Sequence, residues 1–202
     1  NAYGHGARQV VTTLEKAGSD AFAVATLEEG IELRKAGVQA PILILAGVYL
    51  NQLEEILRYR FTPVLYDLET LERLESELKR VDASLGFHLK VDTGMGRIGF
   101  LPSDIDHWLP TLGRLKSLKF DGLISHFSDA ESGEKKYSRN QLATFAAVVE
   151  RLSQLKLCPS LIHMALSAAV ITLPSSYFTM VRPGLILYGV YPAPAMAEKI
   201  AL

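Results

Sequence analysis

The regular recurrence of short apolar runs between longer amphipathic segments constrains this chain most. The intervening segments, such as 26–35, 68–81 and 138–155, carry apolar residues three and four positions apart, the spacing of one helix face. This alternation predicts strand–helix units and hence a parallel sheet. The runs that we expect to form strands are rich in β-branched residues and occupy 21–25, 41–45, 63–66, 87–91, 118–125, 160–164 and 179–181.

Seven expected strands suit an α/β fold of the (β/α)8 TIM-barrel type. Such a barrel usually takes about 250 residues, whereas this chain has 202. We therefore expect a (β/α)8 barrel that lacks its first strand in this sequence. A doubly wound open sheet is the less favoured alternative.

Composition narrows the range of partners. The formal net charge is −1, and lysines and arginines are scattered among acidic residues, so we expect neither a nucleic-acid nor a membrane partner. No run of 18 apolar residues and no signal-peptide pattern occur. Cys158 is the only cysteine, which excludes an internal disulfide and favours a reducing, cytoplasmic location. We expect no metal site.

Polar residues cluster where the expected strands end. In a parallel barrel the carboxyl ends of the strands carry the active site. A single strand-end lysine or arginine is more often solvated or ion-paired than functional, but several polar residues on one rim favour a site. The residues at or just beyond these ends are Lys90, Asp92, His126, Ser167 and Arg182.

Two glycine-bearing segments adjoin these strand ends. Three glycines surround Arg97 in the sequence DTGMGRIG, which forms either a plain wide loop or a loop that holds the guanidinium over a ligand. If the absent strand is counted as the first, Ser167 follows strand seven and Gly184 follows strand eight, the position where many barrels bind phosphate. Ser167 has an equally good reading as a helix N-cap.

Five motifs, in order and over the whole chain, resemble those of bacterial alanine racemases of fold type III. They are NAYGHG at 1–6, KVDTGMGRIG at 90–99, SHF at 125–127, MVRPG at 180–184 and LYG at 187–189. The resemblance implies a pyridoxal 5′-phosphate (PLP)-dependent isomerase, a homodimer, that interconverts L-alanine and D-alanine. The D-isomer serves peptidoglycan synthesis.

The resemblance also implies roles for residues that bind the cofactor. Tyr3 matches the tyrosine that donates to the PLP phosphate, and Ser167 with the backbone N–H groups of Gly184 and Leu185 completes that cradle. One departure is Leu166, where many relatives carry a polar Asn, so any hydrogen bond made by that Asn is lost.

Further positions match residues of the reaction site. Arg97 is expected near the phenolic oxygen of PLP and the substrate carboxylate. Lys90 matches a lysine that is often carbamylated and then holds Arg97. His126 matches a histidine that bonds to the arginine represented by Arg182, which would face the pyridine nitrogen.

The resemblance implies a domain layout too. Residues 1–190 are expected to form the PLP-binding barrel, truncated at its N-terminus, and 191–202 to begin a linker to a β-rich second domain. The lysine that binds PLP covalently would precede Asn1 by two residues, and the second base, a tyrosine, would lie beyond Leu202. We therefore expect residues 1–202 alone to be inactive.

Three rivals remain open. A decarboxylase of basic amino acids shares the barrel but places a carboxylate at the pyridine nitrogen, where this chain has Arg182. A stand-alone PLP carrier would consist of the barrel alone. A racemase of broader amino-acid specificity is not separated from an alanine racemase by these residues.

Overall fold

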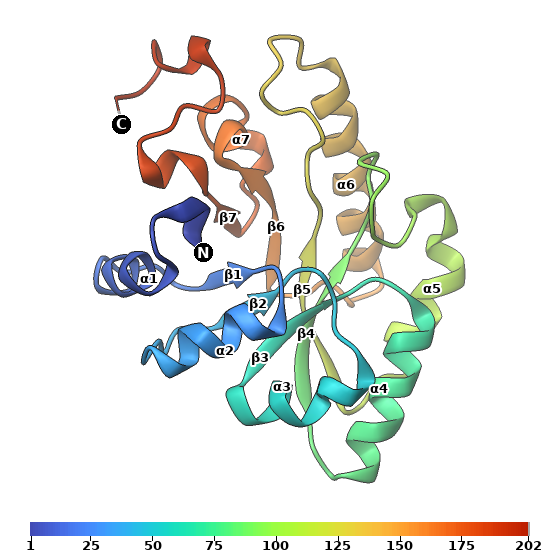
Figure 1. The fold of residues 1–202 in the computed structure, drawn as a ribbon. Coiled ribbons are helices and arrows are strands. Elements are labelled where there is room, and N and C mark those ends of the chain that lie inside the picture. Colours follow the sequence, from blue (N-terminus) through green and yellow to red (C-terminus); the bar gives the residue numbers. More distant parts are fainter. Residues whose placement is uncertain (202) are drawn as a thin grey trace. The chain divides into compact units, whose positions relative to one another are not determined.

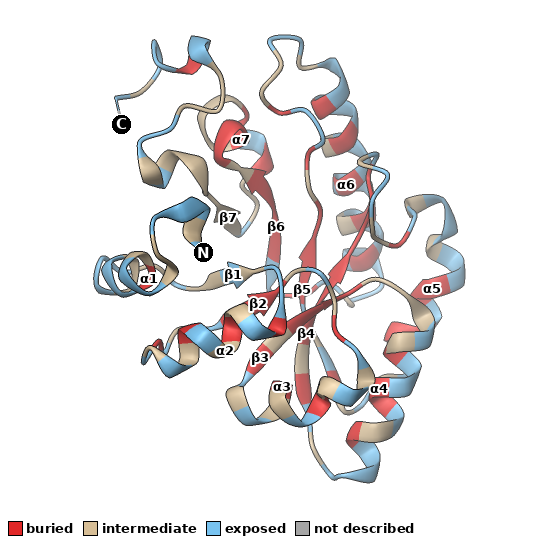
Figure 2. Ribbon diagram, in the orientation of Figure 1, coloured by how far each residue is buried: buried red, intermediate tan, exposed pale blue. Residues whose placement is uncertain are grey.

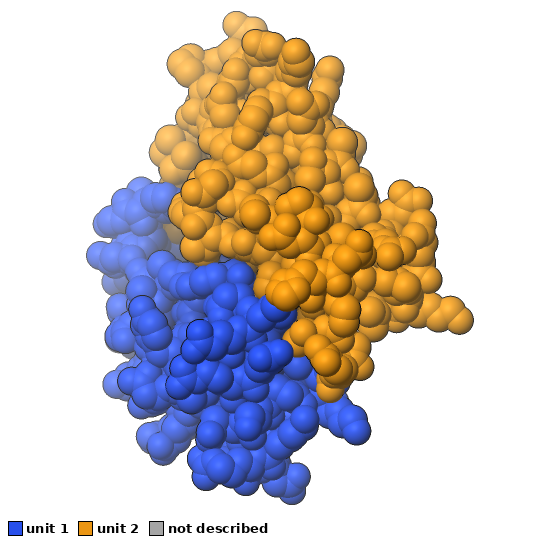
Figure 3. Space-filling model, turned by 90° about the vertical axis from the view of Figure 1, so that its right-hand side faces the viewer, with its two compact units in different colours: residues 1–88, 115–119 blue, residues 89–114, 120–202 orange. Residues whose placement is uncertain are grey.

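The computed structural model describes residues 1–201, which form two compact units (Figure 3). The first unit comprises residues 1–88 and 115–119, and the second comprises residues 89–114 and those from 120 to the C-terminal end. The divisions fall inside two strands, Leu85–Lys90 after His88 and Leu118–Ile124 after Lys119, so each of these strands has residues in both units. Each unit is described by itself below.

Seven strands make one sheet whose order follows the chain, β1-β2-β3-β4-β5-β6-β7. Pairing is parallel between β1, β2 and β3 in the first unit and between β5, β6 and β7 in the second. The strands are β1 (Phe22–Val24), β2 (Ile42–Ile44), β3 (Phe61–Leu65), β4 (Leu85–Lys90), β5 (Leu118–Ile124), β6 (Leu161–Leu166) and β7 (Met180–Arg182).

This half-barrel of parallel strands with helices confirms the predicted α/β class and all seven predicted strands. The largest differences lie at strand ends. β3 begins at Phe61 rather than at Pro63. Pro63 lies inside this strand, where it is in register with Ile44 of β2. β6 continues to Leu166, which is in register with Arg182 of β7. That β1 and β7 flank a missing strand stays a prediction.

Helices connect the strands (Figure 1). The three helices named from periodicity are confirmed, with the start of one moved from 138 to Lys136. The α-helices are α1 (Ala7–Lys16), α2 (Leu27–Lys35), α3 (Leu53–Tyr59), α4 (Leu68–Arg80), α5 (Ile105–Leu112), α6 (Lys136–Gln154) and α7 (Ser167–Thr172).

Local sequence explains why two helices of the first unit begin where they do. The Thr26 side chain accepts from the backbone N–H of Glu29, and the Glu29 carboxylate accepts from the backbone N–H of Thr26, so a capping box starts α2. Asp67 accepts from the backbone N–H of Thr70 at 2.7 Å and starts α4. Both caps satisfy N–H groups that have no partner within the helix.

Strands β2 to β6 and the inward faces of the helices supply the buried residues, as the burial colours show (Figure 2). In α4, Leu71, Leu74 and Leu78 are fully buried at the three- and four-residue spacing seen in the sequence. In the second unit, Phe145 of α6 and Met164 of β6 are also fully buried. No helix among residues 1–201 is long and apolar enough to cross a membrane.

Candidate functional site

The site lies at the carboxyl ends of β4 to β7 and is built wholly from the second unit. Lys90 is the last residue of β4 and Arg182 the last of β7. His126 follows β5, and His163 lies within β6. Parallel strands place these side chains on one rim, as the sequence predicted for Lys90, His126 and Arg182.

Arg182 is the most highly connected side chain at this rim. Its Nη1 hydrogen-bonds to Nδ1 of His163 at 2.5 Å, and its Nη2 donates to the backbone oxygen of Ser125 at 2.7 Å. Nη2 also lies 3.4 Å from Nδ1 of His126 and 3.4 Å from the oxygen of Met164. Burial lowers the pKa of Arg182 to about 10, so the guanidinium stays charged at neutral pH.

These contacts fix the protonation of both histidines. Arginine has N–H donors and no acceptor, so Nδ1 of His163 and Nδ1 of His126 must accept and cannot carry the proton. Burial, and then the positive charges of Arg182, Lys90 and Arg97, lower the pKa of His126 to about 3. His126 is therefore a neutral imidazole with its proton on Nε2. The predicted contact between His126 and Arg182 is present.

Lys90 is a buried amine among cations. Burial is the main cause that lowers its pKa to about 7, and Arg182 and Arg97 lower it further, while Asp92 opposes the change. A large fraction of this amine is consequently uncharged near neutral pH. A neutral buried amine is a nucleophile, unlike the solvated lysines on the surface.

Asp92 organises the glycine-rich loop that carries Arg97. Its Oδ1 accepts from the backbone N–H groups of Gly94, Met95 and Gly96 at 2.8–3.1 Å, and its Oδ2 accepts from that of Arg97 at 2.9 Å. Burial acts to raise the pKa of Asp92, but these four donors outweigh it, so the pKa is lowered. The carboxylate is thus ionised, and both of its oxygens accept hydrogen bonds from the loop backbone.

The loop geometry requires glycine at one position in particular. Gly99 has φ +139°, and a Cβ placed there would lie 2.4 Å from the backbone nitrogen of Asp92. The loop therefore folds back on the end of β4, where the N–H of Asp92 donates to the oxygen of Phe100. The four bonds to Asp92 fix the backbone of this loop. That the loop holds the Arg97 guanidinium over a ligand stays a prediction. The Arg97 side chain itself is exposed.

A pair of buried hydroxyls links the segments that follow β4 and β5. Ser125 Oγ donates to the oxygen of Val91 at 2.8 Å. It lies 2.9 Å from Oγ1 of Thr93, and since its own proton goes to Val91, Thr93 must be the donor. The backbone oxygen of Ser125 accepts a hydrogen bond from Arg182. Ser125 therefore links its own segment after β5 to the end of β7 and to the segment after β4.

Ser167 and Gly184 meet, as the phosphate-loop prediction requires. The backbone N–H of Gly184 donates to Oγ of Ser167 at 2.8 Å, and Leu185 begins the next short helix, Leu185–Tyr188. The N-cap reading of Ser167 is wrong: Leu166 is the N-cap of α7, Ser167 is its first residue, and no side chain caps this helix. The Ser167 hydroxyl is turned to Gly184 instead.

Tyr3 belongs to the first unit, where it lies in a short 3-10 turn, Ala2–Gly4, with its side chain 69% exposed. Its φ of 54° is unusual for a residue other than glycine. Its predicted role at a phosphate stays a prediction.

Sequence reasoning missed three residues of the site. His163, Ser125 and Thr93 were not identified as partners of Arg182 or of the strand ends. A signal existed for His163, because a histidine inside an apolar strand needs a polar partner once it is buried. Ser125 and Thr93 lie within the SHF and KVDTGMGRIG motifs, but nothing in the sequence indicated the hydrogen bond between their hydroxyls.

The fold and this rim together define a class. They describe a parallel α/β half-barrel whose strand ends hold three basic side chains against one carboxylate, and that carboxylate is already engaged by backbone N–H groups. Because basic side chains converge on this rim, we expect an anionic ligand there.

The chain belongs to the alanine racemase family: the family model for the alanine racemase N-terminal domain matches residues 1–192. Among curated relatives, the alanine racemase of Carboxydothermus hydrogenoformans is 39% identical over 201 residues, covering all of this chain and 54% of its own length. That of Sorangium cellulosum is 40% identical over 204 residues, covering 99% of this chain and 54% of its own. The chain thus spans about half the length of these relatives.

Solved structures agree. The alanine racemase of Clostridium difficile 630 in complex with cycloserine superposes with a TM-score of 0.94 at 33% identity, over all of this chain and 56% of that one. The alanine racemase of Bacillus anthracis with bound L-Ala-P gives a TM-score of 0.87 at 29% identity, over 98% of this chain and 51% of that one.

Proposed function

We propose that the full-length protein that carries this chain is a PLP-dependent alanine racemase, an isomerase that interconverts L-alanine and D-alanine. The observation that carries the proposal is the arrangement around Arg182, whose guanidinium lies between two histidines that can only accept from it. Membership of the family supports the same conclusion. The D-alanine formed would serve peptidoglycan synthesis.

The residues present fit PLP. Lys90, Arg97 and Arg182 are basic, while the Asp92 carboxylate is occupied by four backbone N–H groups. The permanent charges of Arg97 and Arg182 are therefore not neutralised by Asp92, and a phosphate or carboxylate could pair with them. Within residues 1–201, no cluster of His, Cys, Asp and Glu has the composition of a metal site.

Three residues of the second unit would hold the phosphate. Ser167 Oγ and the N–H of Gly184 already lie together at 2.8 Å, and the N–H of Leu185 starts the following helix. Hydroxyl and backbone N–H groups at a helix start are common phosphate ligands. In the proposal Tyr3 supplies a fourth donor, on the pattern of the family motif that it matches.

Arg182 would face the pyridine nitrogen of PLP. When bound, PLP accepts the electrons released as the α-proton leaves alanine. A guanidinium can donate to the pyridine nitrogen but has no proton to give up at neutral pH, so that nitrogen stays unprotonated. His126 and His163 hold the guanidinium in place, and Arg97 would bind the substrate carboxylate.

Lys90 is the proposed carbamylated lysine. Its pKa of about 7 leaves much of the amine neutral, and only a neutral amine adds to carbon dioxide. The resulting carbamate is an anion, so modification would replace a buried, unfavourable cation by a partner for Arg97. Burial thus favours the modified form over the protonated one.

The remaining parts of the proposal concern the whole protein. We propose that residues 1–190 are the PLP-binding domain, that 191–202 begin a linker to a β-rich domain, and that the protein is a homodimer in the cytoplasm. The single cysteine, Cys158, is exposed and forms no disulfide, which suits a reducing compartment.

Residues 1–202 alone are proposed to be inactive, because neither of the two bases that the family uses matches a residue among them. Borohydride reduction of this polypeptide with PLP, followed by mass spectrometry, should give no specific adduct. A single stoichiometric adduct at Lys90 would contradict this part of the proposal.

The direct test is formation of D-alanine from L-alanine by the purified full-length protein, measured with a D-amino-acid oxidase. Addition of cycloserine, the compound bound in the C. difficile relative, should inhibit the reaction. Absence of D-alanine formation with PLP bound would instead support a stand-alone PLP carrier. Comparable rates with larger amino acids would support a broad-specificity racemase.

A further inference from the structure

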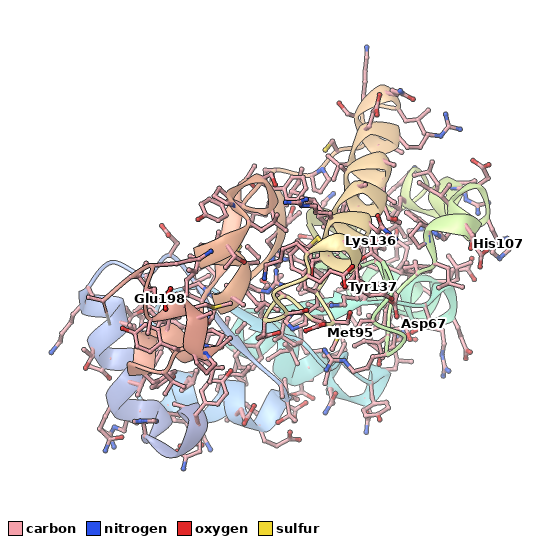
Figure 4. All side chains as sticks on the ribbon, turned by 90° about the horizontal axis from the view of Figure 1, so that it is seen from above. Asp67, Met95, His107, Lys136, Tyr137 and Glu198 are labelled. Atoms are coloured by element: carbon pink, nitrogen blue, oxygen red, sulfur yellow. The ribbon has the colours of Figure 1, made fainter. Side chains whose placement is uncertain are left out.

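Helix α6 contacts the loop that carries Arg97, at a point outside the cofactor and substrate residues described above. Tyr137, the second residue of α6, donates its hydroxyl to the backbone oxygen of Gly94 at 2.6 Å. Gly94 lies three residues before Arg97, inside the segment whose N–H groups bind Asp92. Figure 4 shows the labelled Tyr137 close to Met95 of the same loop.

This contact leaves little freedom to either partner. Gly94 has φ +129°, and a Cβ placed there would lie 2.7 Å from Oη of Tyr137. The loop is thus held from two sides. Asp92 binds its N–H groups from within, and Tyr137 binds one of its carbonyl oxygens from α6.

The same helix also holds the segment that carries His126. Gln141, which is 1% exposed, accepts from the N–H and the hydroxyl of Ser128 at 3.1 Å, and its Nε2 donates to the oxygen of His126 at 3.3 Å. Tyr137 and Gln141 are four residues apart and so share one face of the helix. One helix face therefore connects the Arg97 loop to the His126 segment.

The α6 start is itself fixed, which makes it a suitable support. Ser138, which is 1% exposed, donates to the oxygen of Asp129 at 2.9 Å. Tyr137 by contrast is 50% exposed, so burial of its ring adds little to the core. Its hydroxyl is directed at the loop rather than at solvent.

We propose that Tyr137 is a positioning residue: it holds the 92–97 loop so that Arg97 stays aligned with the ligand site on the side of His126 and Arg182. The inference rests on the proposed function for the identity of the ligand. The loop geometry itself does not depend on that function.

The test uses Tyr137→Phe in the full-length protein, because this change removes only the hydroxyl. Tyr191→Phe is the matched control, since Tyr191 also donates to a backbone oxygen, that of Ile200, at 3.0 Å in the same unit. Hydrogen exchange of the peptide spanning 92–100, KM and kcat for alanine, and the Kd for PLP are measured for each protein.

In Tyr137→Phe we expect the amides of 94–97 to exchange roughly two- to ten-fold faster, and KM for alanine to rise by a similar factor. This factor corresponds to the net contribution of one hydrogen bond. The Kd for PLP should not change, because Ser167 and Gly184 hold the phosphate. Tyr191→Phe should leave all these values as in the unmodified protein.

Unchanged exchange in the 92–100 peptide of Tyr137→Phe would overturn the proposal, as would faster exchange with an unchanged KM. If the unmodified protein does not racemise alanine, the proposed function fails, and the exchange measurement still decides whether Tyr137 holds the loop. An equal effect of Tyr191→Phe on exchange at 92–100 would show a general loosening and would also overturn the assignment.

Discussion

The guanidinium of Arg182 donates to Nδ1 of His163, from the end of one strand to the interior of its neighbour. Among residues 1–201, the hydrogen bonds recorded for Arg182 go to imidazole nitrogens and backbone oxygens, and none goes to a carboxylate. The site thus orients a half-buried cation without neutralising it. Its charge remains available to a ligand.

His163→Leu should destabilise the full-length protein by about 1–3 kcal/mol, because Nη1 of the half-buried Arg182 loses its acceptor. His163→Gln should recover part of this loss, since the amide oxygen accepts where Nδ1 did. Urea unfolding of the three proteins gives the comparison. Equal stability of His163→Leu and the unmodified protein would show that the contact contributes nothing.

His126 predicts a pH dependence of stability. Its pKa is lowered from 6.5 to about 3, so below pH 6.5 the unfolded chain binds a proton at this residue and the folded protein does not. Its contribution is therefore complete above pH 6.5 and is lost as the pH falls from 6.5 towards 3. Between pH 7 and pH 5 we expect a loss of about 2 kcal/mol, at roughly 1.4 kcal/mol per unit.

The measurement is the free energy of unfolding at pH 7 and pH 5 for the unmodified protein and for His126→Gln. Glutamine cannot titrate in this range and keeps an oxygen acceptor for Arg182, so its stability should fall less over the same interval. An identical fall in both proteins would assign the pH dependence to other groups.

Lys90 should be labelled by ¹³C-bicarbonate. The amine must be neutral to form a carbamate, and with a pKa of about 7 it is progressively protonated as the pH falls below that value. We therefore expect a carbamate signal in the ¹³C NMR spectrum at pH 8 that weakens below pH 7. Lys90→Arg should show none, and a signal that persists in this variant would place the carbamate elsewhere.

Glu75 is expected to be the acidic residue of greatest structural weight in the first unit. The residue is 6% exposed, and its carboxylate accepts from the backbone N–H groups of Lys116, Ser117 and Leu118 at 2.8–3.2 Å. It also lies 3.0 Å from the ammonium of Lys79. Burial alone would raise its pKa, but these donors lower it overall.

Glu75→Gln should cost about 1–3 kcal/mol of unfolding free energy, since two oxygens that accept charge-assisted bonds become one. Glu77→Gln, on the same helix, is the control. It breaks a surface pair with Arg80 and should cost about 0–1 kcal/mol. Because the pKa of Glu75 is lowered, the stability that it gives is present above about pH 4.5 and is lost as the pH falls through its folded pKa.

The sequence allowed a good prediction of strands and helices because both depend on a repeated apolar pattern. The seven strands and α4 were visible in that pattern, since burial selects apolar residues at fixed spacing. The polar site could be predicted only in outline. Lys90 and Arg182 were recognisable at strand ends, whereas Ser125 became a site residue only through the oxygen that it offers to Arg182 across 57 residues.

Ser167 shows why local reasoning failed at one position. A serine before two alanines is a typical N-cap, but the true cap is Leu166, and the Ser167 hydroxyl binds Gly184 of a distant segment. Tyr137 gave no signal at all, because its hydroxyl has a partner only once α6 lies beside the Gly94 loop. Such contacts between distant segments are set by the tertiary fold and not by sequence spacing.

Arg182→Glu tests how the proposed enzyme limits itself to racemisation. Both histidines can reverse their tautomers and donate Nδ1–H to the new carboxylate, so the rim has a means of accommodating the change. The oxygens of Ser125 and Met164 would lose their donor, and some loss of stability is expected. A glutamate at this position would favour a protonated pyridine nitrogen, which makes PLP a stronger electron acceptor. We therefore expect slower racemisation, a new absorbance at long visible wavelengths when alanine is added, and pyruvate released by transamination.

Arg182→Lys is the control, since lysine keeps the positive charge but not the planar fork. It should slow racemisation without releasing pyruvate. An Arg182→Glu variant with an unchanged spectrum and product ratio would show that Arg182 does not face the pyridine nitrogen.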